Sequence, residues 1–390
     1  MKWKYQRIGD VCTVERGGSP RPIDDYITKS SNGINWIKIG DTTDSMYITH
    51  TEQKIKPEGM KKSRFVHAGD FLLSNSMSFG RPYILAIDGC IHDGWLVLHD
   101  DENRFDKRFL YYYLSAPITY QKFEHMAVGG VVNNLNSKMV RNLEVPIPAK
   151  SEQEEIADKL DQITRIISNR QHVLTLLDEL VKSRFVEMFG DPVLNPKKWK
   201  QHQLNDEIIF LTSGSRGWSE YFSRDGEIFI TIKNVKNGHI TLDDVQYVHA
   251  PDNAEAKRTK VQAGDLLISI TADLGRTGVV SEALAERGAY INQHLTCVRL
   301  NRNVINPEYA AMFMESAGGK RQFDAKNQVG VKAGLNFEAI KSLKIMVPPL
   351  NLQTQFSTFV HQVEAAKTSV RAQLAALTTL RAKMMQEFFG

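Results

Sequence analysis

Histidine, cysteine and acidic side chains are the residues from which metal sites and catalytic centres are usually built. The sequence has 11 histidines, but none forms a His-x-x-His or Glu-x-x-His pair, the spacing that brings two ligands to one face of a helix. Its three cysteines, Cys12, Cys90 and Cys297, are widely separated, which is typical of buried thiols in a reduced, cytoplasmic protein. No nucleophile has a partner base that the sequence supports. We therefore expect no catalytic residue, no bound metal and no cofactor.

Three short patterns share residue types with enzyme motifs but have simpler structural interpretations. Asp252, Glu255 and Lys257 have the residue types of a metal-dependent nuclease, but the two acids are too close together to come from adjacent strands, so we expect a charged surface turn. Residues 306–309, Asn-Pro-Glu-Tyr, differ in one residue from the Asn-Pro-Pro-Tyr motif of adenine methyltransferases. Because no Gly-rich nucleotide-binding loop precedes them, we interpret them as a helix cap followed by proline at the first helical position. Residues 318–320, Gly-Gly-Lys, lack the spacing of a phosphate-binding loop and are interpreted as a flexible basic loop.

Length, hydropathy and charge favour a soluble protein with more than one domain. At 390 residues the chain is long enough for two or three domains. It has no run of about 18 apolar residues that could cross a membrane, and residues 1–7 lack the apolar core of a signal peptide, so we expect a cytoplasmic protein. The net charge of +4 is too small to identify a nucleic-acid-binding protein. Any affinity for DNA must therefore come from local patches.

Two long stretches, residues 151–189 and 351–389, are predicted to be helices. Steps of four and three from Ile156 to Met188 give ten positions, of which eight are apolar. The positions 200 residues later again include eight apolar residues, with Lys367 among the exceptions. A stripe of this spacing needs a partner helix, so we expect the two helices to form one antiparallel coiled coil. We also expect Ser151 to cap the first helix, with Glu154 completing a capping box.

The chain contains an internal repeat of about 200 residues. Several pairs lie 195 residues apart, namely Ala68-Gly69-Asp70 with Ala263-Gly264-Asp265, Leu72-Leu73-Ser74 with Leu267-Ile268-Ser269, and Gly80-Arg81 with Gly275-Arg276. Later pairs lie 200 residues apart, namely Ile91 with Ile291, Leu135-Asn136 with Leu335-Asn336, Gln153 with Gln353, and Phe189-Gly190 with Phe389-Gly390. One loop that differs by five residues explains the change of offset. An ordered series of matches of this kind indicates a duplicated domain.

The predicted organisation is an α+β chain in which two repeated domains of mixed strands and helices alternate with the long helices. We place the domains at residues 1–150 and 191–349, and the helices at 151–190 and 350–390. Within the domains, short apolar runs between Gly, Asp, Pro and Asn are typical of strands, and small helices are expected after them.

The repeated residues resemble those of the specificity subunit of type I restriction–modification systems. The resemblance rests on the Ala-Gly-Asp block with its following hydrophobic pair and Ser, on the Gly-Arg pair, and on the Leu-Asn pair that precedes a Val/Ile-Pro segment. It also rests on residues 152–156, Glu-Gln-Glu-Glu-Ile, and on the order of domain, helix, domain, helix. It covers essentially the whole chain. One departure is that the second helix opens with Asn-Leu-Gln-Thr-Gln and contains fewer acidic residues.

The resemblance implies a non-catalytic subunit that binds double-stranded DNA. Each repeated domain would be a target recognition domain that reads one half of a split, asymmetric site, and the coiled coil would set the length of the unread spacer. Two adenine-N6 methyltransferase subunits would dock on this scaffold, and two ATP-dependent restriction subunits could join. The remaining apolar positions of the first helix could face the methyltransferase subunits or be buried against the chain's own domains; they are Ile166, Leu180, Phe185 and Phe189.

Three other functions remain open at this point. The same subunit could serve a complex that cuts near its site without translocating, because that difference lies in the partners. The chain could instead be a coiled-coil scaffold whose domains bind protein. An enzyme with its own active site is disfavoured by the absence of a complete motif.

Candidate DNA contacts are residues that can bind phosphates or base edges. In the first half they are Arg16, Arg21, Lys38, Lys61, Lys62, Arg64, Ser74, Asn75 and Arg81. In the second half they are Ser215, Arg216, Lys233, Asn234, Lys236, Lys257, Arg258, Lys260 and Arg276. Matched pairs, such as Arg81 with Arg276 and Lys62 with Lys257, suit phosphate contacts because the DNA backbone is the same at either half-site. Unmatched positions, such as Asn75 against Ile270, suit base reading. His92 and Asn292 also differ between the halves, and His92 has either a structural or a ligand-contacting role.

Overall fold

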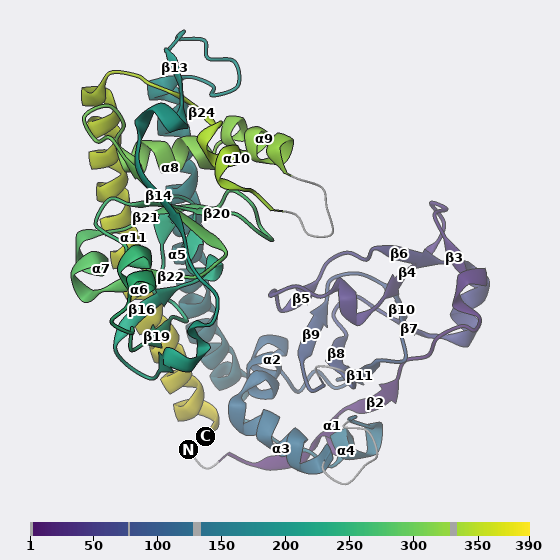
Figure 1. Cartoon of the computed structure of the whole chain (residues 1–390). Coiled ribbons are helices and arrows are strands. Elements are labelled where there is room, and N and C mark those ends of the chain that lie inside the picture. The colour runs from purple at the N-terminus through teal and green to yellow at the C-terminus, as the bar shows by residue number, and fades with distance from the viewer. Residues whose placement is uncertain (1–2, 77–78, 128–133, 328–333) are drawn as a thin grey trace. The chain divides into compact units, whose positions relative to one another are not determined.

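The computed structural model describes residues 3–76, 79–127, 134–327 and 334–390 (Figure 1). The chain forms two compact units, one of residues 1–171 with 372–390 and the other of residues 172–371. Each of the two long helices is divided between these units. Within the described ranges, no helix is both long and apolar enough to cross a membrane.

The first unit contains two larger sheets and one small one. Its first five-stranded sheet has the order β2 (Thr13–Arg16), β11 (Trp95–His99), β8 (Phe71–Ser74), β9 (Pro82–Leu85) and β5 (Tyr47–Ile48). Its second has the order β3 (Ile27–Thr28), β6 (Gln53–Ile55), β4 (Ile34–Ile37), β10 (Gly89–Ile91) and β7 (Arg64–Val66), and β1 (Tyr5–Arg7) pairs with β12 (Glu144–Pro146). The helices α1 (Ile8–Val11), α2 (Lys107–Ser115), α3 (Pro117–Ala127) and α4 (Ser137–Arg141) complete the domain. Strands β8 and β9 are buried along their whole length, as their continuous apolar runs predict.

The second unit has a similar order of elements, but its two larger sheets have four strands each and it has an additional two-stranded pair. One larger sheet has the order β14 (Ile208–Ser213), β23 (Leu295–Leu300), β20 (Leu266–Ser269) and β21 (Thr277–Val279). The other has the order β15 (Phe222–Ser223), β19 (Gln246–Val248), β16 (Glu227–Ile230) and β22 (Ala289–Ile291). Smaller pairs are β13 (Gln201–Gln203) with β24 (Lys344–Met346) and β17 (Val235–Lys236) with β18 (His239–Ile240). Its helices are α6 (Ala254–Thr259), α7 (Glu282–Arg287), α8 (Pro307–Glu315), α9 (Ala317–Lys326) and α10 (Phe337–Lys341). As β11 pairs antiparallel with β2 and β8, so β23 pairs antiparallel with β14 and β20. The duplication predicted from the sequence is therefore a structural one.

The repeated Ala-Gly-Asp block forms the same turn in both units. Gly69 and Gly264 have φ angles of +95° and +80°, which glycine adopts without strain. The carboxylate of Asp70 accepts a 2.8 Å hydrogen bond from the backbone N–H of His67, and Asp265 makes the equivalent bond, also of 2.8 Å. The block is thus a turn that leads into β8 and β20.

The two long helices are α5 (Lys150–Phe189) and α11 (Leu350–Phe389), and they form the predicted antiparallel coiled coil. In the first unit, Ile156 and Leu160 near the start of α5 share a core with Phe389 at the end of α11. In the second unit, the opposite ends meet, since Phe185 of α5 packs against Phe356 of α11 with ring centroids 5.5 Å apart. Start packs against end in each unit, which is the antiparallel order.

The predicted Ser151 cap is wrong, because α5 begins one residue earlier and includes Ser151. The start of the helix is held instead by Gln153, whose side chain is fully buried. Its Nε2 donates 3.0 Å hydrogen bonds to the carbonyl oxygens of Pro148 and Arg104, and its Oε1 accepts from the N–H of Asp106 at 2.8 Å. Gln353 makes the same three bonds at the start of α11. The matched glutamines therefore join each long helix to the domain that precedes it.

Candidate nucleic-acid interface

The enzyme-like patterns take up ordinary structural roles. Asn306 caps α8, and its side chain accepts a hydrogen bond from the N–H of Tyr309 at 3.1 Å, as interpreted from the sequence. Lys257 and Asp252 form an exposed ion pair of 2.8 Å, but Glu255 and Lys257 lie in the helix α6 and not in the surface turn that we expected. Residues 318–320 are not the flexible loop that we expected, because they lie in α9, where the two glycines are buried and allow close approach to the preceding helix and to Pro192. Among the described residues, no group of three or more His, Cys, Asp or Glu side chains could hold a metal ion.

In the first unit, the loop after β2 meets the turn between β10 and β11. Asp93 is the centre of this turn. The Ser19 hydroxyl donates to its Oδ1 at 3.1 Å, and the Arg21 guanidinium donates to its Oδ2 at 3.3 Å. Its backbone carbonyl accepts from Arg16 Nε at 3.1 Å and from Asn75 Nδ2 at 2.9 Å. The turn thus holds two exposed arginines in defined positions.

The charge of Asp93 is maintained by its neighbours. Burial by itself raises the pKa of this carboxyl, but His92, the Ser19 hydroxyl and nearby arginines lower it, and the pKa lies below its ordinary value of 3.8. His92 Nδ1 accepts from the N–H of Gly94 at 2.9 Å, and its Nε2 lies 2.9 Å from Asp93 Oδ1. Asp93 is therefore an anion at neutral pH that orients the cations around it.

A cleft of about 520 Å³ opens beside this turn, and Lys38, Trp36 and Gln53 line it together with His92 and Arg21. Lys38 also lies 3.4 Å from Glu52, in a largely exposed pair. The cleft presents an ammonium group, an amide and an imidazole from three different strands and turns. Groups of this kind can bind phosphate oxygens or base edges.

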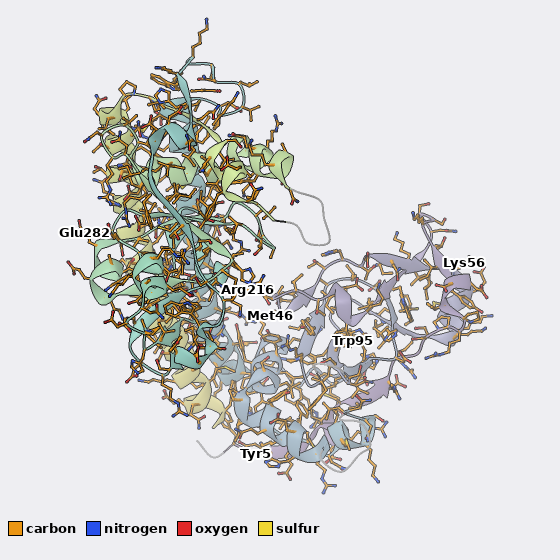
Figure 2. The ribbon with its side chains drawn as sticks, viewed as in Figure 1. Tyr5, Met46, Lys56, Trp95, Arg216 and Glu282 are labelled. Carbon is orange, nitrogen blue, oxygen red and sulfur yellow. The ribbon has the colours of Figure 1, made fainter. Side chains whose placement is uncertain are left out.

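In the second unit, Arg258 occupies the corresponding region. Its guanidinium donates to the Ser213 carbonyl at 2.8 Å and to the Ser215 hydroxyl at 2.9 Å, and it also contacts the Thr212 hydroxyl. Arg216 follows in the same loop and is exposed (Figure 2). Two arginines and a serine hydroxyl therefore lie together, as predicted candidates, on one loop and the helix beside it.

The turn between β22 and β23 in the second unit carries Asn292, Gln293 and His294. Thr271 Oγ1 lies 2.6 Å from His294 Nδ1, and Gln293 Nε2 lies 3.0 Å from His294 Nε2. Asn292 Oδ1 accepts from the N–H of His294 at 3.1 Å. This turn has no acidic side chain and is rich in amide and imidazole groups, unlike its counterpart around Asp93.

Most of the other candidates are at the surface but do not join these groups. Lys62 donates to the Tyr26 hydroxyl at 2.6 Å. Arg64 is an exception, because its Nε donates to the carbonyl of Arg16 at 3.2 Å, and it also pairs with Glu15 at 2.9 Å. The remaining exposed candidates are Lys61, Lys233, Lys236, Lys257 and Lys260.

Three candidates are buried and have structural partners. Ser74 Oγ accepts from the N–H of Arg81 at 2.9 Å. Asn234, 1% exposed, accepts from Thr231 and donates to two backbone carbonyls of the same loop. Asn75, 3% exposed, holds the Asp93 turn as described above. We therefore correct our expectation for these three, because their hydrogen-bonding groups serve the fold and are shielded from a DNA surface.

The matched pair Arg81 and Arg276 differ in their surroundings. Arg276 forms an ion pair with Asp273, three residues earlier. Arg81 is exposed and lines a cleft of about 670 Å³ together with Tyr111 and Tyr120. Their backbones are equivalent, since each N–H donates to the hydroxyl of the matched serine, Ser74 or Ser269.

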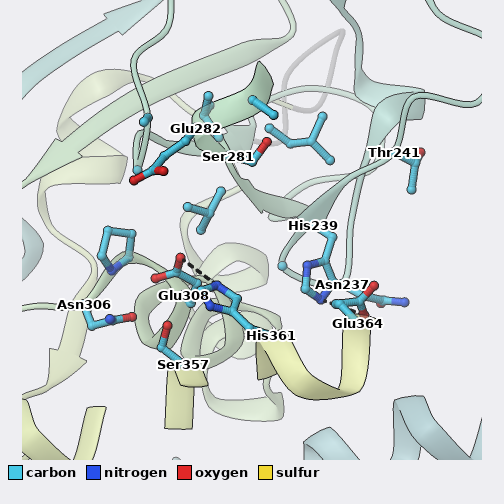
Figure 3. Close-up of a pocket in the computed structure, with 18 of the residues that line it drawn as sticks. Asn237, His239, Thr241, Ser281, Glu282, Asn306, Glu308, Ser357, His361 and Glu364 are labelled. Carbon is cyan, nitrogen blue, oxygen red and sulfur yellow. Dashed lines mark ion pairs between the residues drawn. The ribbon is translucent and has the colours of Figure 1, made fainter. Parts of the chain in front are cut away.

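The sequence did not identify the turn residues Asp93, Gln293 and His294. The available signal was the mismatch of His92 with Asn292 inside an otherwise matched stretch. No sequence pattern indicated the polar cluster in a cavity of about 1310 Å³ between the β17–β18 hairpin and α11 (Figure 3).

Lys367 is at the centre of that cluster. Its side chain is only 6% exposed, and its Nζ lies 2.7 Å from Asp178 and 2.6 Å from Glu364. Glu364 also faces His239 at 3.3 Å and Arg371 at 3.8 Å. Burial lowers the pKa of His239, and Lys367 acts in the same direction while Glu364 opposes it.

Of the apolar positions left over on α5, Phe185 and Phe189 are buried within the second unit. Ile166 and Leu180 remain 38% and 47% exposed. Only the latter two are therefore available to another protein.

Comparison with known families agrees with the duplicated fold and the paired helices. The model of the type I restriction modification DNA specificity domain matches residues 1–177 and 196–379. The chain belongs to this family. It has the role of a specificity subunit of a type I restriction–modification system and is not itself an enzyme.

Similarity to individual relatives is low in sequence but extends over the whole chain. The chain is 24% identical over 407 residues to the type I restriction enzyme EcoKI specificity subunit of Escherichia coli K12, covering 95% of this chain and 84% of that protein. A chain from a type I restriction–modification complex has a TM-score of 0.63 at 16% identity, covering 99% and 97% of the two chains. The specificity subunit of M. genitalium has a TM-score of 0.57 at 14% identity, covering 100% and 96%. These structures share the fold.

Proposed function

We propose that the chain recognises an asymmetric, bipartite site on double-stranded DNA, with one half-site for each repeated domain. Residues 1–150 and 191–349 would be the two target recognition domains. The helices of residues 151–190 and 350–390 would hold them apart and set the length of the unread spacer. A rigid spacer suits this task because half-sites must match the helical repeat of DNA, about 34 Å per turn.

The observation that carries this proposal is the duplication of one framework with unlike polar surfaces. The two units share strand pairing and the glutamine that joins domain to helix. The first unit presents arginines around Asp93, whereas the second presents Arg258 beside a turn that has no acidic side chain. A shared framework supports binding to the same DNA backbone, and unlike surfaces support different half-sites.

The partners that we propose are those of a type I complex acting on cytoplasmic DNA. Two adenine-N6 methyltransferase subunits would dock on the scaffold, and two ATP-dependent restriction subunits would join them. Exposed apolar residues on α5, such as Ile166 and Leu180, support a protein contact there. The chain itself would need no cofactor.

We propose that the DNA contacts come from the exposed and half-buried candidates on the two domains. These are Arg16, Arg21, Lys38, Lys61, Lys62, Arg64 and Arg81 in the first, and Ser215, Arg216, Lys233, Lys236, Lys257, Arg258, Lys260 and Arg276 in the second. Phosphate contacts by such residues release counterions, so binding should weaken steeply with salt.

The test is to sequence modified adenines, molecule by molecule, in cells that carry the chain with its neighbouring methyltransferase subunit. We expect a split motif with two unlike halves, of which one half changes when residues 1–150 are exchanged for those of a related subunit. A soluble, assembled complex that methylates no new motif would refute DNA recognition and favour a protein-binding scaffold. Whether the complex translocates depends on the partners, and adding the restriction subunits and mapping the cut positions decides it.

A further inference from the structure

The turns at residues 92–94 and 292–294 have the same backbone but different side chains. The first turn is held by four backbone hydrogen bonds. They run from the N–H of His92 to the carbonyl of Ile37 (3.1 Å), from Trp95 to His92 (3.1 Å), from Asn75 to Gly94 (2.9 Å) and from Gly17 to Trp95 (2.9 Å). The second turn has four equivalent bonds. They run from the N–H of Asn292 to the carbonyl of Ile230 (3.1 Å), from Leu295 to Asn292 (3.1 Å), from Ile270 to His294 (3.0 Å) and from Gly214 to Leu295 (3.1 Å). Each of these four backbone bonds in the first turn therefore has its counterpart in the second.

A glycine fixes the position of each turn. A Cβ at Gly17 would overlap the carbonyl oxygen of His92, and a Cβ at Gly214 would overlap that of Asn292. The loop that follows the first strand of the sheet can therefore approach each turn closely only because it carries glycine there. Tight packing of this kind holds the turn rigid, and a rigid turn presents its side chains in a defined direction.

The side chains on this shared backbone differ at every position. The first turn carries His92, Asp93 and Gly94, and the second carries Asn292, Gln293 and His294. Gly94 and Asn292 are buried, whereas the partly exposed residues His92 and Asp93 of the first turn differ in charge and in donor pattern from Gln293 and His294 of the second. An arginine lies beside each turn. Arg21 donates to Asp93, and Arg258 donates to the hydroxyl of Ser215, which forms a β-bridge with Asn292.

We propose that these two turns determine which bases each domain accepts, an inference that rests on the proposed function. In the second domain, Gln293 is the base reader, because a glutamine amide can pair with the N6 and N7 edge of adenine in the major groove. In the first domain, Asp93 is a positioning residue that holds Arg21, whose guanidinium suits the O6 and N7 edge of guanine. Phosphate contacts such as Arg258 add affinity without adding choice.

The test uses the full chain with its methyltransferase subunit and compares methylated motifs among three variants. Gln293→Ala is expected to relax one position in the half-site of the second domain by about 10-fold or more and to leave the other half unchanged. Asp93→Asn, which keeps the side-chain shape, is expected to relax one position in the first half only. Gln201→Ala is the matched control, since Gln201 is exposed on the β13–β24 pair, away from the sheets that carry the turns.

The unaffected half of the motif is an internal control for folding and assembly. An unchanged motif in both turn variants overturns the inference but leaves the proposed function intact. Uniform loss of methylation in an assembled complex also overturns it, because the turns would then supply affinity or stability and not choice of base. A wild-type complex that methylates no split motif overturns both the inference and the proposed function.

Discussion

Lys367 offers the most direct test of how the coiled coil is held together, because it is a buried charge inside an apolar stripe. Its ammonium group lies 2.7 Å from Asp178 on α5 and 2.6 Å from Glu364 on its own helix. Removing a cation of this kind leaves two carboxylates facing each other, whereas replacing the interhelical pair with apolar residues of similar size is often neutral or stabilising. We therefore consider Lys367→Met, Asp178→Leu and the double variant.

The magnitudes follow from the exposure of the partners. Breaking a fully buried pair costs roughly 3–5 kcal/mol. Asp178 is 40% and Glu364 25% exposed, so water screens the carboxylates that remain, and we expect Lys367→Met to cost about 2 kcal/mol. In a unit of about 200 residues this lowers Tm by about 4–8 °C. In the double variant Glu364 keeps its contacts with His239 and Arg371, and we expect stability within about 1 kcal/mol of wild type.

The assay is differential scanning calorimetry of the full chain for the wild type, the two single variants and the double variant. A double-mutant cycle isolates the coupling between Lys367 and Asp178 from the loss of packing. We expect the double variant to be more stable than Lys367→Met alone. Additive losses in the two single variants would refute the reasoning, because they would mean that the two charges do not act as a pair.

Three further predictions concern other buried groups. His239 faces Glu364, Lys367, Asp178 and Arg371, and its pKa is lowered in the folded chain. The unfolded chain therefore binds the proton more readily, and stability should be lost as the pH falls below 6.5, the ordinary pKa of histidine. Thermal scans at different pH values should show this loss, with a weaker pH dependence in His239→Asn. Gln153→Ala should lower the free energy of unfolding by about 2–4 kcal/mol in denaturant titrations, because it leaves three backbone groups without partners, whereas exposed Gln171→Ala on the same helix should have almost no effect. Burial raises the pKa of Cys12 to about 12 and that of Cys90 to about 11, and it shifts the pKa of Cys297 in the same direction. An alkylating reagent at about pH 8 should therefore modify these thiols only after the chain unfolds. Rapid labelling of the native chain, measured by mass spectrometry, would contradict this.

The features of the fold that depend on periodicity could be predicted from the sequence. The spacing from Ile156 onward and its copy from Phe356 require two long helices that cover each other, and these helices are present. Turn chemistry was equally local: Asn306 and Pro307 predicted the start of α8, and Asn306 is its cap. The start of α5 was not predictable in this way, since a buried glutamine with tertiary partners replaces the expected serine cap.

The candidate site was predictable in composition but not in geometry. Exposed arginines could be listed from their type, but the residue that organises them, Asp93, is an acid that no search for basic residues selects. Asn75 and Asn234 are of a residue type that can read bases, but their side-chain amides donate to the backbone carbonyls of Asp93 and Thr241. The tertiary fold alone brings these carbonyls close to the two asparagines. In the sequence, Lys367 is only a charged residue that interrupts the apolar positions of the second long helix, and its partner Asp178 lies 189 positions away. Such long-range pairs have no signature in a local pattern.

The matched phenylalanines at the ends of the two long helices show how the duplication is used. Phe189 follows the first domain in sequence but packs against Tyr309 of the second, with ring centroids 4.7 Å apart. Phe389 follows the second domain but packs against Phe109 of the first, at 5.6 Å. Each helix therefore begins in the core of the domain before it and ends in the core of the other. The core of the first unit therefore includes Phe389 from the last residues of the chain, and residues 372–390 belong to that unit although they are about 200 positions away from the rest of it in sequence.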